Sequence, residues 1–460
     1  MHAMIPNQFK IVSNNFHQGV RYNLCGSIMY ELIKTVHNFF LLNILTHSDY
    51  GLIASVISII YFASKVADIG AASSLSLMFM HLTQSRLAFK KLFKKYYLYP
   101  HIPLMLIIAL CIAWTNHYHI QASHFWVWAL VPIIMLGESI RYFLRIFLHA
   151  AFKSRHVVFI EVLLYVGFVA MVWIPYLLYQ RPIDLAGFLI AHVIDTWVCT
   201  TIFIGYTYFF YTKLPAQTNP PPHPSTTRIW YTKIINYSVR ISRDFFASNF
   251  LTPLFAYKCG LEAAGAFYFA SVIVNALHST IKMSIHYPAN GLLWNLHTSS
   301  HTTKKEAFSL LFHKLTTLII PIIIFIAINH SWLLRLGNYG HMTSTTMLII
   351  AALISIAILD SLLLLYEQFY IAEQATHSFL LLKVLECILL YSFVIKSTQT
   401  TLLSLLIYAV MIKLLSFGIT ILNAFSRWRI KPTILIQRRW LIGASIISGI
   451  FYYIMYLFFR

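Results

Sequence analysis

The chain has 460 residues, of which 59% are hydrophobic and only 10% are charged, and its mean hydropathy is +0.70. Soluble domains carry about a quarter charged residues, so this composition excludes a soluble globular protein and indicates a polytopic membrane protein. A net charge of +20 would suggest nucleic-acid binding in a soluble chain, but here basic cytoplasmic loops beside anionic headgroups account for most of it, and no nucleic-acid partner is expected.

Apolar runs long enough to cross a hydrocarbon core of about 30 Å recur along the whole chain, and the fold class expected is all-α. The sequence predicts about 13 transmembrane helices (12 to 14) by this length criterion. In chain order they cover 21–42, 51–80, 103–114 (extended back to 97), 125–148, 157–179, 185–211, 234–257, 262–285, 308–330, 343–365, 378–396, 402–425 and 440–459. The segment 366–377 is expected to be a loop, and the polar N-terminus shows no cleavable signal peptide.

A proline-rich break, "KLPAQTNPPPHPSTTR", divides these helices into two sets. We therefore expect a six-helix bundle over 1–211, an extended cytoplasmic linker over 212–233, a second six-helix bundle over 234–425, and a basic loop with an additional helix over 426–460. Because six is even, both halves start on the same side of the membrane and would be parallel repeats. Gly51 and Gly265, each just after an acidic residue at a corresponding helix joint, support this repeat.

Basic loops set the expected orientation. "RLAFKKLFKKYY", "KSRH", "HTTKKE" and "SRWRIKPTILIQRR" carry most of the loop lysine and arginine, whereas the loops between them carry few. The positive-inside rule then places these loops and the N-terminus in the cytoplasm.

The sequence gives no sign of catalysis or metal binding. The five cysteines stand singly, and His297 and His301 lie in a polar loop without a third ligand, so neither a disulfide framework nor a metal site is indicated. We find no HExxH, DxD or glycine-rich nucleotide loop, and we expect no enzyme and no cofactor.

Cations inside the apolar segments are the main functional signal, because a lysine or arginine at a helix centre costs roughly 2.5–3.5 kcal/mol on insertion scales. Local spacing offers pairs for most of them: Glu31–Lys34, Lys65–Asp68, Glu138–Arg141, Arg240–Asp244 and Lys383–Glu386. Arg145, Lys282 and Lys413 could snorkel to an interface. Arg145, Arg243 and Lys282 keep no sequence-local partner, which predicts an aqueous cavity that attracts an anion. The alternative for Arg240 and Arg243 is structural pairing with Asp244 and the headgroup region.

The segment 41–79, "LLNILTHSDYGLIASVISIIYFASKVADIGAASSLSLMF", resembles the early region of bacterial polysaccharide flippases. The shared features are the Tyr50–Gly51 turn and the Asp68-x-Gly70 motif followed by small residues, and "LEAAGAFYFASVIV" resembles the same family's second half. These Wzx-type proteins belong to the MOP superfamily, with the lipid II flippase and the MATE drug exporters. Members have twelve or fourteen helices, so an odd count departs from the pattern.

The resemblance implies a MATE-like V-shaped arrangement in the bacterial inner membrane and a monomeric flippase working by alternating access. The implied substrate is an undecaprenyl-pyrophosphate-linked oligosaccharide, and the implied partners are membrane lipids and glycan polymerase or ligase machinery. The expected substrate-binding residues are Arg21, Lys34, Lys65, Arg141, Arg145, Arg240, Arg243 and Lys282, and the expected coupling or charge-pairing acids are Glu31, Asp68, Glu138 and Asp244. The alternatives are a MATE-like exporter of small molecules, an integral membrane enzyme of glycan assembly and a non-catalytic scaffold.

Overall fold

A computed structural model describes residues 5–67, 75, 79, 85–95, 125–151, 153–214, 226–286, 289, 302–317, 319, 345–373, 375–396 and 402–428. All regular secondary structure in these ranges is helical, which confirms the predicted all-α class. Seven of the described helices are long and apolar enough to span a membrane. The expected helices at 103–114 and 440–459, and Asp68, lie outside the described residues.

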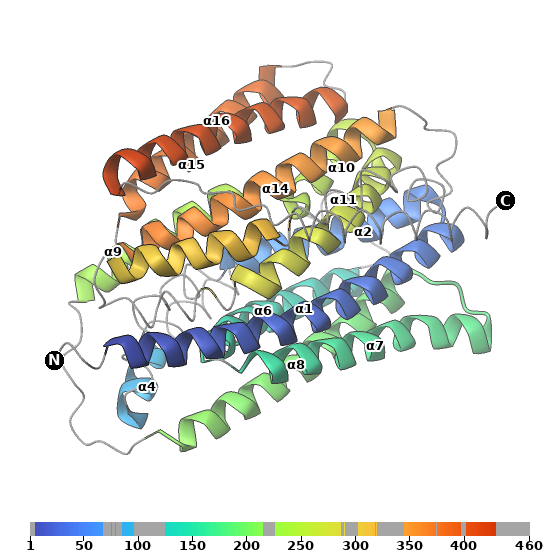
Figure 1. The fold of residues 1–460 in the computed structure, drawn as a ribbon. Coiled ribbons are helices and arrows are strands. Elements are labelled where there is room, and N and C mark those ends of the chain that lie inside the picture. The colour runs from blue at the N-terminus through green and yellow to red at the C-terminus, as the bar shows by residue number, and fades with distance from the viewer. Residues whose placement is uncertain are drawn as a thin grey trace, which may run out of the picture.

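The helices follow one another in two sets along the chain (Figure 1). The first half contains α1 (Ile5–Ile44), α2 (His47–Ala67), the short α4 (Arg86–Phe93), α6 (Phe125–Ala150), α7 (Ser154–Tyr179) and α8 (Leu185–Thr212). The second half contains α9 (Thr226–Asp244), α10 (Ser248–Cys259), α11 (Leu261–Ile281), the π-helical turn η3 (Lys282–His286), a helix over 302–317, α14 (Thr345–Ala372), α15 (Thr376–Lys396) and α16 (Leu402–Trp428).

The largest departure from the expected helices lies at 234–257, where one span was predicted. The structure divides it into α9 and α10 at 245–247, where the amide groups of Phe246 and Ala247 bond to carbonyls only three residues earlier. Pro253 lies inside α10, where it cannot donate to the carbonyl of Asn249, so it affects α10 itself and not the break. The first half of this span, which forms α9, is rich in polar residues, whereas α10 is mostly apolar.

Three expected irregular segments contain helix. The linker predicted over 212–233 is helical from Thr226 onward, where α9 begins. The loop predicted over 366–377 is helical as far as Ala372, which places Glu367 inside α14. The basic segment after residue 85 forms α4, whose first turn is capped by the Ser85 side chain accepting from the amide of Ala88 at 3.2 Å.

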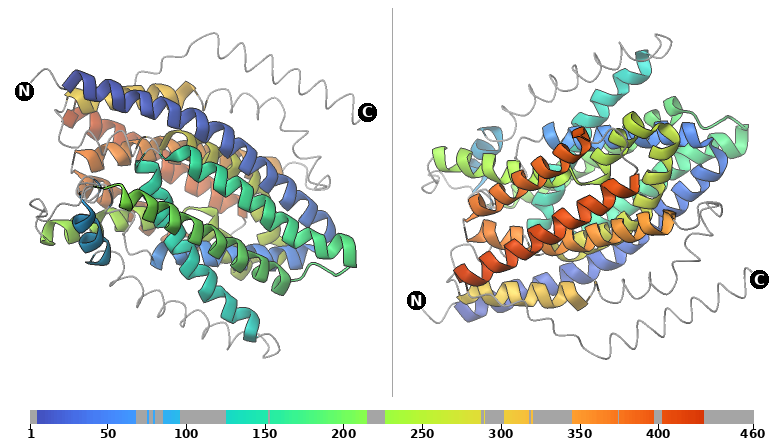
Figure 2. Two further views of the ribbon diagram at one scale, coloured as in Figure 1. Left: turned by 90° about the horizontal axis from the view of Figure 1, so that it is seen from below. Right: turned by 90° about the horizontal axis from the view of Figure 1, so that it is seen from above.

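Helix packing repeats between the halves (Figure 2). In the first half α1 packs on α7, α6 on α8 and α2 on α6; in the second, α9 packs on α15, α14 on α16 and α11 on α14. Between the halves α2 packs against α11. The contact of α1 with α11 corresponds to the contact of α10 with α2, with the two halves exchanged. This is the packing expected of two parallel repeats that face one another.

Gly51 and Gly265 lie where the halves meet most closely. A Cβ on Gly51 would overlap the carbonyl oxygen of Leu261, and a Cβ on Gly265 would lie 3.1 Å from the carbonyl oxygen of His47. Gly51 therefore allows the backbones of α2 and α11 to approach each other more closely than a side chain would permit, and at Gly265 a Cβ would fit only tightly. One buried apolar cluster is centred on α2 with α6 and α8, and another on α10, α11 and α16. A third cluster contains residues of both halves, among them Phe147 and Phe369.

Candidate functional site

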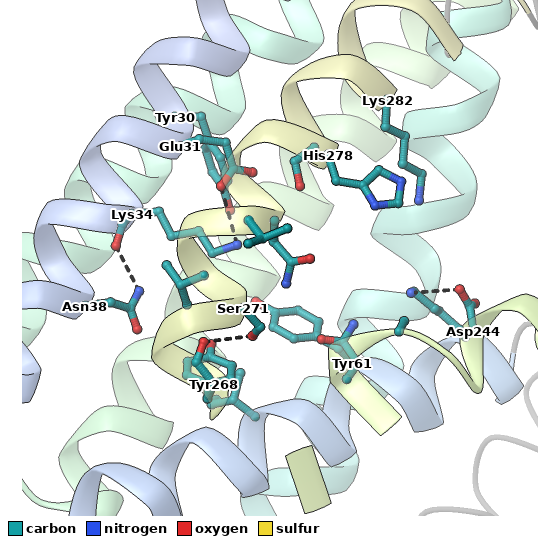
Figure 3. A pocket seen from close by; sticks show the side chains of 18 of the residues that line it. Tyr30, Glu31, Lys34, Asn38, Tyr61, Asp244, Tyr268, Ser271, His278 and Lys282 are labelled. Atoms are coloured by element: carbon teal, nitrogen blue, oxygen red, sulfur yellow. Dashed lines mark hydrogen bonds and ion pairs between the residues drawn. The ribbon is translucent and has the colours of Figure 1, made fainter. Parts of the chain in front are cut away.

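A cavity of about 320 Å³ lies between the two halves. It is walled by α1, α2, α6, α7 and α8 from the first half and by α9, α10, α11 and α14 from the second. The break between α9 and α10 opens onto it through Phe246 and Ala247. Figure 3 shows part of this wall, with side chains from several helices pointing toward the same space.

On the first half, Arg141 is the centre of a buried charge cluster. Its guanidinium lies 2.9 Å from Glu138 on the same helix and 3.5 Å from Asp195 on α8. One turn further along α6, the Nε of Arg145 lies 2.7 Å from Oε1 of Glu161 on α7. Each guanidinium therefore has a carboxylate partner, which is the condition under which a buried charge is tolerated.

On the second half, Arg243 of α9 pairs with Glu367 of α14 at 2.8 Å. Asp244 pairs with Lys65 of α2 at 3.3 Å, so this ion pair joins the two halves. Arg240 is buried, donates to the carbonyl oxygen of Lys65 at 3.3 Å and lies over the rings of two tyrosines. Asp244 thus pairs with Lys65 of another helix and not with Arg240 as expected, whereas the expected Lys65–Asp68 pair lies outside the described residues.

Lys282 differs from these cations. It begins η3, directly after α11, and lines the cavity (Figure 3). Within the described part of the chain its ammonium group forms no ion pair and no hydrogen bond, although it lies in electrostatic range of Arg243, Arg145 and Asp244. Lys282 therefore brings a positive charge to the cavity wall without a carboxylate bound to it.

The structure brings most of the predicted site residues together. The cavity wall includes Lys34, Lys65, Arg141, Arg145, Arg243 and Lys282, and the acids Glu31, Glu138 and Asp244. Arg240 lies behind this wall, and Arg21 is exposed on α1 away from it. The predicted local pairs Glu31–Lys34, at 3.6 Å, and Glu138–Arg141 are present.

Sequence spacing missed the carboxylates that come from other helices. Glu161 and Glu367 neutralise Arg145 and Arg243, the two arginines for which no local partner was expected. Both acids are visible in the sequence as charges inside or beside apolar segments, but nothing in the spacing indicates which cation each meets. Asp195 and Asp360 were likewise missed as cavity-lining acids.

A second charge network lies inside the second half. Lys413 does not snorkel: it is fully buried and its Nζ lies 2.8 Å from Asp360 of α14 and 3.0 Å from Glu386 of α15. Lys383 donates to the other oxygen of Glu386 at 2.6 Å, as its i,i+3 spacing predicts. Asp360 also lines the cavity, so the network reaches the cavity wall. In the described ranges no three His, Cys, Asp or Glu side chains are placed to hold a metal ion.

Comparison with solved structures shows that the chain has the fold of MATE transporters. It is similar to "Crystal structure of MATE in the straight conformation", with a TM-score of 0.62, 14% identity and coverage of 90% of this chain and 96% of the other. It is also similar to "Crystal structure of eukaryotic MATE transporter AtDTX14" (TM-score 0.58, 12% identity, 96% and 99% covered). A third similar structure is "Outward-facing conformation of a multidrug resistance MATE family transporter of the MOP superfamily" (TM-score 0.58, 12% identity, 90% and 96% covered).

No family model matches the sequence, and no curated protein matches it significantly. The structural matches span nearly the full length of both chains, so they support the predicted two-bundle fold as a whole. At 12–14% identity they establish the fold and leave the substrate open.

Proposed function

We propose that this protein is a membrane transporter that moves an anionic, lipid-linked oligosaccharide across the bacterial inner membrane by alternating access. The observation that carries the proposal is the cavity between two repeated bundles, which Lys282 lines and where no described carboxylate lies within ion-pair distance of its ammonium. A buried cation without a partner is costly, and a phosphate or pyrophosphate group entering the cavity would supply the missing negative charge.

The neighbouring cations strengthen the attraction for an anion. Arg243 and Lys65 line the same region of the cavity. Glu367 neutralises Arg243 and Asp244 neutralises Lys65, so the charge of Lys282 is the one not neutralised by a described partner in this region. A pyrophosphate would lie near Lys282, with the polyprenyl tail remaining in lipid between helices. The proposed orientation keeps the N-terminus in the cytoplasm, so that the close approach at Gly51 and Gly265 lies toward the outer face.

A second candidate is export of a small organic cation, as in a multidrug exporter. The observation in its favour is the set of carboxylates that line the cavity: Glu31, Glu138, Asp195, Asp244 and Asp360. Each of these acids lies within ion-pair distance of a cation of the chain. A cationic substrate would have to displace one of those partners, whereas an anion meets Lys282 directly. We therefore favour the anionic substrate.

Transport by the purified protein in liposomes tests the proposal. The probe is a fluorescent polyprenyl-pyrophosphate-linked disaccharide, whose arrival in the opposite leaflet is followed by a membrane-impermeant quencher. We expect Lys282→Gln to slow translocation by at least about tenfold, which corresponds to about 1.4 kcal/mol. Lys213→Gln, at the exposed end of α8, is the matched control and should leave the rate unchanged.

Two results would count against the anionic substrate. One is equal translocation by the Lys282→Gln variant and the wild type. The other is active export of a cation such as ethidium by a wild-type protein that does not move the pyrophosphate probe, which would favour the second candidate.

A further inference from the structure

Four tyrosines converge on the cavity from four helices. Tyr30 comes from α1, Tyr61 from α2, Tyr165 from α7 and Tyr268 from α11, so both halves contribute. All four side chains are half-buried. Figure 3 shows Tyr61 and Tyr268 in the lower part of the cavity and Tyr30 above them, beside Glu31, while Lys282 lies at the opposite side.

The rings of these tyrosines are held by aromatic neighbours. Tyr30 and Tyr165 have ring centroids 4.7 Å apart. Tyr61 packs against the ring of His192 with centroids 5.7 Å apart, and Tyr268 packs edge-on against Tyr50 at 6.0 Å. These contacts fix the ring planes, so that a ligand would meet a preformed aromatic surface.

The hydroxyl groups, in contrast, have no hydrogen-bond partner among the described residues. Across the described ranges none of the four phenolic oxygens takes part in a hydrogen bond, and none is sealed away from the cavity. A phenol can both donate and accept, and leaving a buried hydroxyl unsatisfied costs roughly 1–3 kcal/mol. Four such groups around one cavity therefore suit water or a ligand that offers several hydroxyls of its own.

The charged side chains near the tyrosines are paired with one another. Glu31 pairs with Lys34 beside Tyr30, and Glu138 and Asp195 both pair with Arg141 near Tyr61. Ser271 and Asn275, which also line this part of the cavity, are neutral. This part of the wall therefore differs from the region of Lys282, where the positive charge is not balanced. Aromatic faces combined with neutral donors and acceptors match a sugar, which presents hydroxyls at its rim and C–H groups on its ring faces.

We propose that Tyr30, Tyr61, Tyr165 and Tyr268 form a carbohydrate-binding subsite, separate from the cationic region at Lys282. This inference rests on the proposed transport of a lipid-linked oligosaccharide and assigns its sugar part to a defined wall of the cavity. The two halves share the subsite, because Tyr268 belongs to α11 and the other three belong to the first half. A sugar held there would contact both halves at once.

Binding by the full-length protein in lipid nanodiscs tests the subsite with two probes that differ only in their sugar. One is farnesyl pyrophosphate whose terminal phosphate is capped with a methyl group, and the other carries a disaccharide of N-acetylglucosamine in place of the methyl group, so that both probes have the same charge. The ratio of their dissociation constants isolates the contribution of the sugar. We expect the wild type to bind the glycosylated probe at least about tenfold more tightly, and the four-fold Tyr→Phe variant to lose this gain, because several hydrogen bonds of modest strength are removed.

The Tyr→Phe variant keeps the rings and should fold as the wild type does. Its affinity for the methyl-capped farnesyl pyrophosphate should be unchanged, which serves as an internal control for folding and for the cationic region. Tyr208→Phe, on an exposed part of α8, is the matched control and should keep the sugar gain.

Three results would overturn the subsite: no sugar gain in the wild type, a full sugar gain in the four-fold variant, or tight binding of tetraphenylphosphonium that all four phenylalanines preserve. The last result would identify an aromatic cage for cations, because a phenylalanine ring supports cation–π contact without a hydroxyl. Failure of the subsite alone leaves translocation of the pyrophosphate probe intact, whereas failure of the proposed function abolishes translocation in the wild type as well.

Discussion

Replacing Lys413 with methionine should destabilise the second half strongly. The ammonium of Lys413 is fully buried, within 3.0 Å of two carboxylates, and lies 4.2 Å from the centre of the Phe246 ring. Methionine keeps the length of the side chain and removes its charge. Glu386 retains Lys383 at 2.6 Å, so the carboxylate left without a counter-ion is that of Asp360.

The magnitude follows from that uncompensated charge. Breaking a buried ion pair by removing one partner costs about 3–5 kcal/mol, and we expect the lower end because Asp360 borders the cavity. Adding Asp360→Asn removes the stranded charge, and the double variant should recover on the order of 1–3 kcal/mol of the loss. Lys213→Met is the control, because this lysine is exposed at the end of α8 and pairs with no carboxylate among the described residues; its cost should stay below about 0.5 kcal/mol.

The free energy of unfolding can be measured by titrating SDS into mixed micelles and following tryptophan fluorescence. The reasoning would be refuted if Lys413→Met cost no more than Lys213→Met. It would also be refuted if Asp360→Asn failed to recover any stability in the Lys413→Met background. The cost of Lys413→Met would then not come from the unpaired, buried carboxylate of Asp360.

Two further predictions concern movement and orientation. Gly51→Ala should slow translocation by about tenfold or more, because the close backbone approach of α2 to α11 leaves no room for a methyl group. Gly167→Ala is the control and should transport normally, because Gly167 has open space around it. Equal rates for the two variants would show that the close contact is not needed for transport. A single cysteine at Lys90 on α4 should be protected from a membrane-impermeant thiol reagent in intact cells, and one at Gln180 between α7 and α8 should react; the reverse pattern would invert the proposed topology.

The sequence predicts the helices well wherever length and hydropathy decide the outcome. The helix expected over 185–211 is α8, Leu185–Thr212, and the one expected over 402–425 is α16, Leu402–Trp428. The interruption at 245–247 could not be predicted in this way, because a hydropathy window averages over three residues that leave the helix. The break arises from tertiary contacts: Phe246 packs in the apolar cluster centred on α10, α11 and α16, and Arg243 pairs with Glu367 of α14.

The charge pairs show the same limit. Pairs on one helix, such as Glu138–Arg141 and Lys383–Glu386, follow from i,i+3 spacing. The partner of Arg145, Glu161, lies on another helix, and local spacing carries no information about helix packing. Sequence reasoning therefore found the cations of the cavity but overestimated how many are unneutralised.

Each half contains a buried ion pair in an equivalent place, with the signs exchanged. Arg141 of α6 meets Asp195 of α8, and Asp360 of α14 meets Lys413 of α16, in two helix pairs that pack alike. Exchanging the signs keeps the attraction between the two helices. The two repeats therefore share an ion pair at this place, although not the same residue types.

Each of these two ion pairs joins helices of the same half and so stabilises that half as one unit. The ion pair Lys65–Asp244 is different, because it joins the two halves, and its lysine side chain is 19% exposed whereas that of Lys413 is 0% exposed. A pair that water reaches costs less to separate than a fully buried one. The distribution of charge therefore favours motion between the halves over motion inside them, as the proposed alternating access requires.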